Sequence, residues 1–223
     1  MKIKLPVLII NFKTYRNGTG EKALEIAKQA SKIAKKLSVN IALAVQAPDI
    51  YRIAKNVDIP VLAQHVDPVV YGAHTGHLLP EAVKEAGAVG TLLNHAEHRL
   101  GLEILEECIK RCQEIKLQTI VCTENLEEAA KIAGLEPDFI AFEDPVLIGT
   151  GKPISKLKSE SVKKFASMFD RKPIPLCGSG ISSEDDVKTA LELGTKGVIV
   201  ASAIMKSRNV EEKIKELASG LRC

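Results

Sequence analysis

The chain contains no tryptophan, few aromatic residues (4%) and no apolar run that approaches the length of a bilayer-spanning helix. Such a helix needs about 20 consecutive apolar residues, so no transmembrane segment and no membrane partner are expected. The first residues, MKIKLPVLIINFK, carry two lysines before a short apolar run that Pro6 interrupts, and no small-residue cleavage site follows. They are therefore predicted to form a strand of the mature protein and not a signal peptide.

Cysteine is also scarce, and charge of one sign does not dominate. The 5 cysteines are odd in number and include no C-x-x-C motif. This argues against a secreted disulfide framework and favours a cytoplasmic location. Lys and Arg total 31 against 28 Asp and Glu, which gives a net charge of only +3. Because nucleic-acid binders show a basic stripe or block, and none is visible, no nucleic-acid partner is expected.

What the chain does contain is a regular alternation of short β-branched runs and longer amphipathic segments, repeated eight times over 223 residues. Runs such as VLII and GVIVA are apolar at successive positions, which is typical of parallel strands buried on both faces. The predicted strands cover residues 5–12, 39–45, 60–66, 90–94, 118–122, 139–142, 174–177 and 197–201, and the predicted helices cover 21–37, 48–56, 80–86, 100–115, 126–133, 159–169, 183–193 and 210–221.

Eight strand–helix units predict a single α/β domain over residues 1–223, folded as a (β/α)8 barrel. The alternative is an open, doubly wound sheet. Its usual G-x-G-x-x-G motif after the first strand is missing here. In the barrel, catalytic groups lie at the carboxyl ends of the strands, which directs attention to the residues that follow each run.

Several chemically useful groups stand at those strand ends. Asn11 and Lys13 close the first strand, His95 and Glu97 follow the fourth, and Glu143 follows the sixth. Small residues come after Glu143 and after the last two strands, in the segments IGTG at 148–151, CGSG at 177–180 and AS at 201–202. We expect all of them to face one mouth of the barrel.

Each group alone has a more ordinary explanation: a solvated lysine, a structural histidine, a salt-bridge glutamate or a flexible turn. Their coincidence at five strand ends favours a site. A carboxylate base, a neutral imidazole and an ammonium suit proton transfer beside a carbonyl. Small residues let backbone N–H groups approach a phosphate, and the segment SSE at 182–184 predicts a helix start there. The glycine-rich loop after Glu143 is typical of a lid.

The motifs N-x-K, H-x-E-x-R, E-x-P-V-x-I-G-T-G-K and C-G-S-G occur in this order, and the stretch from Asn11 to Lys206 resembles the triosephosphate isomerase family, most of all its archaeal branch. The resemblance implies interconversion of dihydroxyacetone phosphate and D-glyceraldehyde 3-phosphate through an enediolate, in glycolysis and gluconeogenesis, with no cofactor and no metal. Two departures fall at the lid and the phosphate loop: Asp144 stands where many members have proline, and Ala201-Ser202 where many have two glycines.

The resemblance also implies a role for each matching position. Glu143 would be the base and Lys13 the cation; His95, the electrophile, would be kept neutral by a helix start near Ala96, in the family's known division of labour. Glu97 would help to hold Lys13. The residues implied to bind substrate are Asn11, Lys13, Ile148, Gly149, Gly180, Ala201 and Ser202.

The loop Gly72–His77 resembles the family's interlocking loop, which implies a homo-oligomer, with a tetramer built as a dimer of dimers favoured over a dimer. The same loop holds the pair His74-x-x-His77, and with His95-x-x-His98 it offers ligand-like spacing for zinc. Two other functions compete with the isomerase: a different phosphate-binding barrel, such as a sugar-phosphate isomerase or lyase, and a non-catalytic barrel that serves as a subunit.

Overall fold

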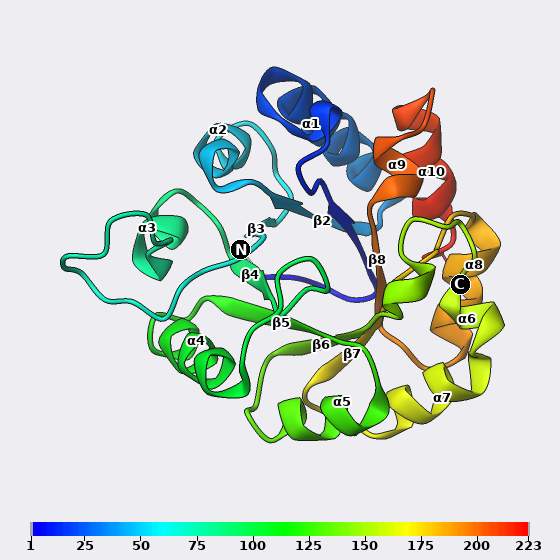
Figure 1. Ribbon diagram of the computed structural model, residues 1–223. Helices are drawn as coiled ribbons and strands as arrows, with labels where there is room; N and C mark the ends of the chain where they lie inside the picture. The colour runs from blue at the N-terminus through cyan, green and yellow to red at the C-terminus, as the bar shows by residue number, and fades with distance from the viewer. Residues whose placement is uncertain (1, 223) are drawn as a thin grey trace.

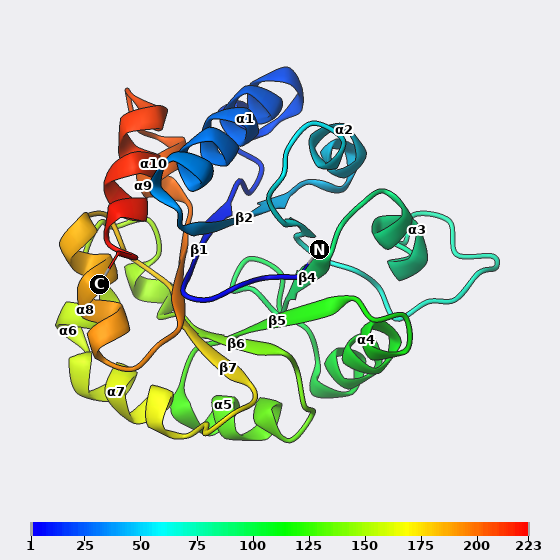
Figure 2. The same ribbon diagram turned by 180° about the vertical axis from the view of Figure 1, so that it is seen from behind.

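The computed structural model describes residues 2–222 and forms a closed barrel of eight parallel strands, in the order in which they occur in the chain. The last strand pairs with the first and closes the barrel, with Val7 opposite Gly197 and Ile10 opposite Val200. Figure 1 shows the strands at the centre and the helices around them, and Figure 2 shows the same arrangement from behind. The predicted barrel is confirmed.

The strands are β1 (Val7–Asn11), β2 (Asn40–Val45), β3 (Val61–Ala63), β4 (Gly90–Leu93), β5 (Gln118–Thr123), β6 (Phe139–Phe142), β7 (Ile174–Cys177) and β8 (Gly197–Val200). The α-helices are α1 (Gly20–Leu37), α2 (Ile50–Ala54), α3 (Pro80–Glu85), α4 (Leu102–Glu114), α5 (Leu126–Ala133), α6 (Ile154–Leu157), α7 (Ser159–Ser167), α8 (Glu184–Glu192), α9 (Ser202–Met205) and α10 (Val210–Ser219). Three 3-10 turns complete the order: η1 (Arg16–Gly18), η2 (Ala47–Asp49) and η3 (Pro145–Leu147).

The core has two layers because successive side chains of a strand point to opposite faces. Ile9 lies in the cluster that fills the barrel, whereas Leu8 and Ile10 pack in the shell between strands and helices. The helices complete this shell with one apolar face each. Buried Ala23, Ala27 and the other apolar residues of α1 recur at helical spacing, which explains why that segment is a helix.

All eight predicted helices are present, with ends that differ by a few residues. The sequence analysis missed α6, α9, η1 and η3. Each is four residues or shorter, which is too short for a periodic apolar pattern. The predicted third strand, 60–66, shortens to Val61–Ala63 because the residues after Ala63 leave the sheet. Across residues 2–222, no helix combines the length and the apolar character that a bilayer crossing requires.

Candidate active site

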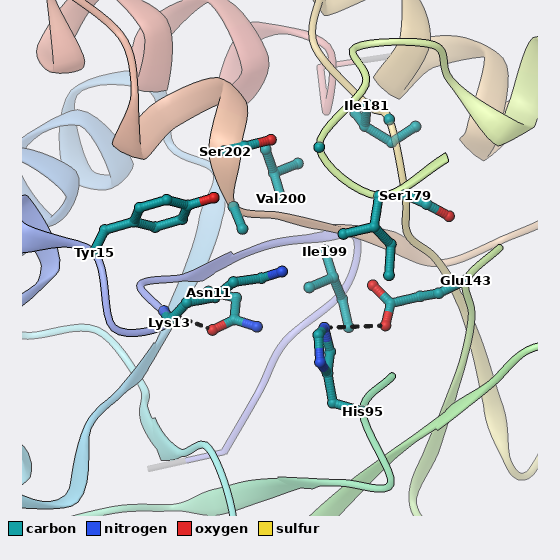
Figure 3. A pocket seen from close by; sticks show the side chains of 14 residues that line it. Asn11, Lys13, Tyr15, His95, Glu143, Ser179, Ile181, Ile199, Val200 and Ser202 are labelled. Carbon is teal, nitrogen blue, oxygen red and sulfur yellow. Dashed lines mark hydrogen bonds and ion pairs between the residues drawn. The ribbon is translucent and has the colours of Figure 1, made fainter. Parts of the chain in front are cut away.

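A pocket opens at the carboxyl ends of the strands, where the parallel arrangement brings together loops that are far apart in the sequence (Figure 3). It contains every predicted catalytic and substrate-binding residue, and Glu97 lines an adjoining hollow together with Lys13 and His95. The pocket is lined by Asn11, Lys13, Tyr15, His95, Glu143, Ile148, Gly149, Ser179, Gly180, Ile181, Ile199, Val200, Ala201 and Ser202.

Glu143 follows β6 directly and is only 5% exposed. Its backbone N–H donates to the carbonyl of Thr123 at 2.9 Å, which continues the β5–β6 ladder one residue further. Its Oε2 atom is buried and accepts no hydrogen bond from any described residue. A buried carboxylate oxygen without a donor is costly, so this atom is poised to meet a ligand.

Gly178 makes room for that carboxylate. A Cβ atom at this position would lie 2.4 Å from Oε1 of Glu143, far inside van der Waals contact. The strand-seven loop therefore needs a glycine here because the Glu143 side chain fills the space that any other residue would occupy.

His95 faces Glu143 across the pocket, with 3.7 Å between its Nε2 atom and Oε2 of Glu143 (Figure 3). Its Nδ1 atom accepts a hydrogen bond from the backbone N–H of Glu97 at 3.1 Å. Because a backbone N–H only donates, Nδ1 presents a lone pair and the proton of the ring lies on Nε2. The Nε2–H group is thus aimed at the pocket.

The helix start expected near Ala96 is wrong. Residues 95–98 form a turn closed by a 2.8 Å hydrogen bond from the N–H of His98 to the carbonyl of His95, and α4 begins only at Leu102. The tautomer of His95 with its proton on Nε2 is therefore favoured by one backbone donor at Nδ1, and no helix begins at this loop. The turn replaces the helix because its N–H groups bond within the loop.

Lys13 adopts a left-handed backbone conformation, with φ of 46°. This conformation costs a non-glycine residue about 1–3 kcal/mol and persists only where the surroundings enforce it. The surroundings do so here: Oδ1 of Asn11 accepts from the N–H of Lys13 at 3.0 Å, and Nε2 of Gln64 donates to the carbonyl of Lys13 at 3.0 Å. The Lys13 ammonium then reaches Oε1 of Glu97 at 2.8 Å, the pairing that was expected.

The glycine loops and β8 form the opposite side of the pocket. Gly180 has φ of 73°, and a Cβ atom there would lie 1.8 Å from the carbonyl oxygen of Lys152. The helix start predicted at Ser183 is confirmed: Ser183 caps α8 in a capping box with Asp186. Asp186 also accepts from the N–H of Ser182 at 3.0 Å. These donors at the start of α8 are thus already engaged.

The segment from Asp144 to Ile154 forms a flap with Ile148 and Gly149 over the pocket and Val146 80% exposed. Both of its ends meet Ser179. The N–H of Asp144 donates to the Ser179 hydroxyl at 2.8 Å, and the N–H of Ile154 donates to the Ser179 carbonyl at 3.2 Å. Between these ends, the Ser182 hydroxyl donates to the carbonyl of Gly151 at 3.4 Å.

Asp144, the residue that departs from the family pattern, fixes the first end of this flap. Its carboxylate accepts from the N–H of Val146 at 3.0 Å and pairs with the ammonium of Lys158 at 2.6 Å. The hydrogen bond from Lys158 lowers the pKa of the Asp144 carboxyl. At this end of the flap, many family members have a proline that restricts the backbone. In this chain the Asp144–Lys158 ion pair holds the same position.

The two histidine pairs lie in different surroundings. His98 packs on His65 with ring centroids 4.3 Å apart, and His74 and His77 lie in an exposed loop. Within residues 2–222, no group of three or more His, Cys, Asp or Glu side chains is placed to hold a metal ion.

Sequence reasoning missed Gln64, Tyr15, Ser179 and Asn94, which line or support the site. Gln64 directly follows an apolar run, and this strand-end signal was available. Asn94 precedes His95, and asparagine is enriched where φ is positive, which is also a usable signal. The motif CGSG marks the loop of Ser179, but it does not predict the contacts of Ser179, which come from segments 25 and 35 residues away.

Comparison with known proteins gives a consistent result. The family model described as triosephosphate isomerase matches residues 6–217. The chain is 48% identical to the triosephosphate isomerase of Methanobacterium bryantii, over 96% of each chain, and 46% identical to that of Methanocaldococcus jannaschii, over 95% of this chain and 98% of the relative. The crystal structure of triosephosphate isomerase from Bartonella henselae superposes with a TM-score of 0.71 at 22% identity, covering 94% of this chain and 97% of that one, which supports the fold.

Proposed function

The chain belongs to the triosephosphate isomerase family and is an isomerase of triose phosphates, and from this premise we propose that Glu143, His95 and Lys13 carry out the reaction without a cofactor. The observation that carries the proposal is the pair formed by the donorless Oε2 of Glu143 and Nε2 of His95, 3.7 Å apart in one pocket. That separation is too long for a hydrogen bond between them, so both groups stay available to a substrate.

The proton transfer follows from the two groups. The Glu143 carboxylate removes a proton from the carbon beside the carbonyl of dihydroxyacetone phosphate and returns it to the neighbouring carbon, which yields D-glyceraldehyde 3-phosphate. Between these steps the Nε2–H of His95 donates to the enediolate oxygens and moves the proton from one to the other. The Lys13 ammonium offsets the charge of the intermediate, and Glu97 holds the ammonium in place.

The phosphate binds to backbone N–H groups on the opposite side of the pocket. The donors are those of Gly149, Gly180, Ala201 and Ser202, with Ile148 covering the substrate and Asn11 beside Lys13. This choice is supported by the commitment of the Ser182 and Ser183 N–H groups to Asp186, which leaves the pocket-lining loops as donors. Closing the flap brings the Gly149 N–H to the phosphate and excludes water from the enediolate.

The proposal also covers the cellular location, the pathway and the oligomeric state of the protein. The protein acts in the cytoplasm, in glycolysis and gluconeogenesis, as one barrel domain over residues 1–223. It forms a homo-oligomer through the exposed loop 72–77 and the neighbouring Tyr71, which is 71% exposed. A dimer of dimers is favoured, with a dimer as the alternative, and light scattering distinguishes the two by mass. Four described cysteines are buried free thiols, which suits a reducing compartment.

The test is a coupled assay that follows glyceraldehyde 3-phosphate and dihydroxyacetone phosphate in both directions. The Glu143→Gln variant keeps the shape of the side chain but accepts no proton, so turnover is expected to fall by about 10²–10⁴-fold. The matched control is Glu192→Gln, which changes an exposed glutamate on α8 and is expected to leave turnover unchanged. Near-normal turnover of a folded Glu143→Gln protein overturns the assignment of the base.

A further inference from the structure

Asn94 stands between β4 and His95 and has an unusual backbone. It is 2% exposed, and its φ of 58° lies in the left-handed region. Asparagine is one of the few residues besides glycine that reach this region at modest cost. The left-handed residue ends the strand and reverses the chain, and His95 follows immediately. The backbone of Asn94 therefore determines the direction in which the imidazole leaves the barrel wall.

The Asn94 side chain fastens the loop that carries His95. Its Oδ1 atom accepts from the N–H of Leu100 at 3.0 Å, which joins the two ends of the segment 94–100. Its Nδ2 atom donates to the carbonyl of Cys122 on β5 at 3.0 Å and to Oε1 of Glu128 at 3.2 Å. One buried amide thus closes the loop on itself and ties it to the next strand.

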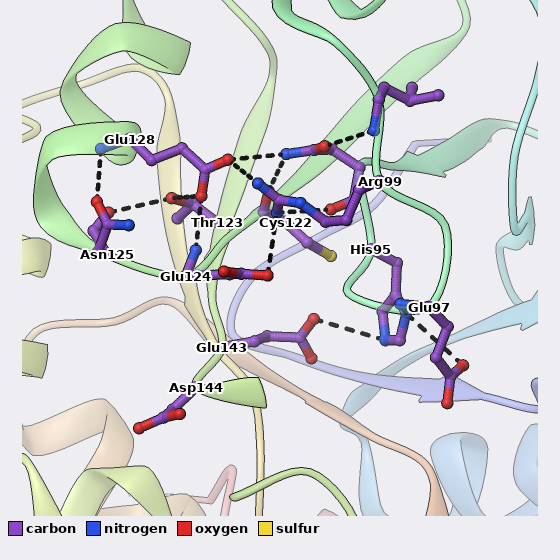
Figure 4. Close-up of polar contacts among 12 residues, drawn as sticks. His95, Glu97, Arg99, Cys122, Thr123, Glu124, Asn125, Glu128, Glu143 and Asp144 are labelled. Carbon is purple, nitrogen blue, oxygen red and sulfur yellow. Dashed lines mark hydrogen bonds and ion pairs between the residues drawn. The ribbon is translucent and has the colours of Figure 1, made fainter. Parts of the chain in front are cut away.

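Glu128, on α5, holds this amide by accepting its hydrogen bond. Its other oxygen accepts from the hydroxyl of Thr123 at 3.0 Å and from the N–H of Glu124 at 2.8 Å. Arg99 pairs with Glu128 (Figure 4). It also donates to the carbonyl of Asn94 at 3.2 Å. Burial raises the pKa of the Glu128 carboxyl, but the donors from Glu124 and Arg99 outweigh it and the net pKa is lowered. The anchor is therefore an ionised carboxylate.

The end of β5 connects this network to the other half of the catalytic pair. The Cys122 carbonyl holds Asn94, and the next carbonyl, that of Thr123, accepts the backbone N–H of Glu143. The Cys122 side chain lies inside the barrel near Glu143; burial, followed by this negative charge, raises the pKa of its thiol. Two consecutive carbonyls of one strand thus hold the segments that carry the acid–base pair.

We propose that Asn94, supported by Glu128, is a positioning residue that sets the distance and angle between His95 and Glu143. The inference rests on the catalytic roles proposed above for those two residues. It adds the contacts that keep their side chains at a fixed distance from each other. Proton transfer depends steeply on geometry, and a displacement of about 1 Å costs on the order of 10²-fold in rate. Asn94 touches no phosphate donor, so its contribution falls on the chemical step.

The main test compares kcat and KM for Asn94→Gly. Glycine adopts the positive φ freely, so this variant preserves the backbone turn and removes only the amide. We expect kcat to fall by about 10–100-fold while KM changes by less than about threefold. The nitrogen chemical shifts of the His95 ring report the same event: one sharp set in the wild type, and shifted or broadened signals in the variant. Unchanged kcat together with unchanged His95 signals overturns the proposal.

Two further variants separate positioning from general stability. Glu128→Gln leaves Asn94 in place but removes the carboxylate behind it, and a smaller loss of kcat, with the same His95 shifts affected, is expected. Asn209→Ala is the matched control, because Asn209 caps α10 through the N–H of Glu212 and is not among the residues that line the pocket. It should lower the melting temperature and leave kcat unchanged. A kcat loss in Asn209→Ala that equals the loss in Asn94→Gly identifies a stability effect and overturns the positioning role.

A double-mutant comparison distinguishes failure of this inference from failure of the proposed function. If Asn94 acts through His95, Asn94→Gly should cost little further rate in a His95→Gln background. A full, multiplicative loss in that background contradicts positioning. If His95→Gln alone leaves kcat intact, the proposed function fails at its electrophile. If His95→Gln is slow but Asn94→Gly is not, only the positioning role is lost.

Discussion

The two sides of the pocket are built by different means. On the side of His95 and Lys13, amides and carboxylates fix the backbone: Asn94 holds one loop and Gln64 the other. On the side of the flap, glycines and exposed apolar residues predominate, and the ties concentrate at the two ends that meet Ser179. Proton transfer and substrate entry thus place opposite demands on a chain, and one barrel meets both at its strand ends.

Removing the flap should have the largest effect. Deletion of residues 148–151 eliminates the Gly149 donor and the cover over the enediolate, so isomerisation is expected to fall on the order of 10³-fold. Some proton abstraction should persist because Glu143 remains, and the exposed intermediate should lose phosphate to give methylglyoxal. Both products are measured at equal substrate consumption. If the fraction of methylglyoxal matches the wild type, the flap does not protect the intermediate.

Removing the fixed electrophile should come next. His95→Gln loses the donor that stabilises the enediolate oxygen, and kcat is expected to fall on the order of 10²-fold. In contrast to the deletion, methylglyoxal should not increase per turnover, because the flap is intact. An NMR titration of wild type with a bound inhibitor checks the premise that His95 acts in its neutral form. An imidazolium at working pH contradicts it.

The cation on the fixed side should show a mixed effect. Lys13→Met removes a charge that serves both phosphate-bearing substrate and enediolate, so KM should rise and kcat should fall, with kcat/KM reduced by about 10–100-fold. Steady-state kinetics at two ionic strengths measures this. Glu97→Gln is the companion variant, since it leaves the ammonium but removes its 2.8 Å partner. Wild-type kcat in the Lys13→Met protein contradicts the catalytic role of Lys13 and identifies it as an ordinary solvated lysine.

A substitution at Gly178 tests how tightly the position of the Glu143 carboxylate is constrained. Gly178→Ala places a methyl group where Oε1 of Glu143 now lies, so the base must shift. We expect kcat to drop by roughly tenfold or more with a smaller change in KM. Gly101→Ala, where an added Cβ meets nothing within 4 Å, is the control. Equal activity of both variants shows that the carboxylate tolerates movement.

The smallest effect concerns the hinge of the flap and its dependence on pH. The Asp144 carboxyl has a lowered pKa in the folded protein, so its ionised form stabilises the fold at pH values above its ordinary value of 3.8. This stabilisation is lost as the pH falls through the lowered pKa. Asp144→Asn should therefore reduce the unfolding free energy by less than about 1 kcal/mol near neutral pH and by still less in acid. Denaturant titrations at several pH values, with Lys158→Met alongside, measure the difference. A difference that persists unchanged in strong acid contradicts the ion pair.

Much of the architecture was predictable from the chain. The runs 139–142 and 174–177 match β6 and β7 residue for residue, because apolar segments buried on both faces have no competing pattern. The strand predicted at 60–66 was too long, since Gln64 leaves the ladder to hold Lys13. The expected helix near Ala96 failed for a related reason: local propensity does not reveal that His95 needs a turn whose N–H groups bond back to the histidine.

The number and order of the strands, and the residue types at their ends, can be read from the chain, because apolar periodicity and strand-terminal motifs are local properties. How those ends lie relative to one another depends on the folded barrel. Pairing of β4 with β5 brings the Asn94 amide to a carbonyl 28 residues away, and pairing of β6 with β7 brings the Ser179 hydroxyl to Asp144, 35 residues away. No spacing in the sequence encodes these contacts, since they arise from the stagger of neighbouring strands. The Asn94 contact fixes the His95 loop on one side of the pocket, and the Ser179 contact fixes an end of the flap on the other side.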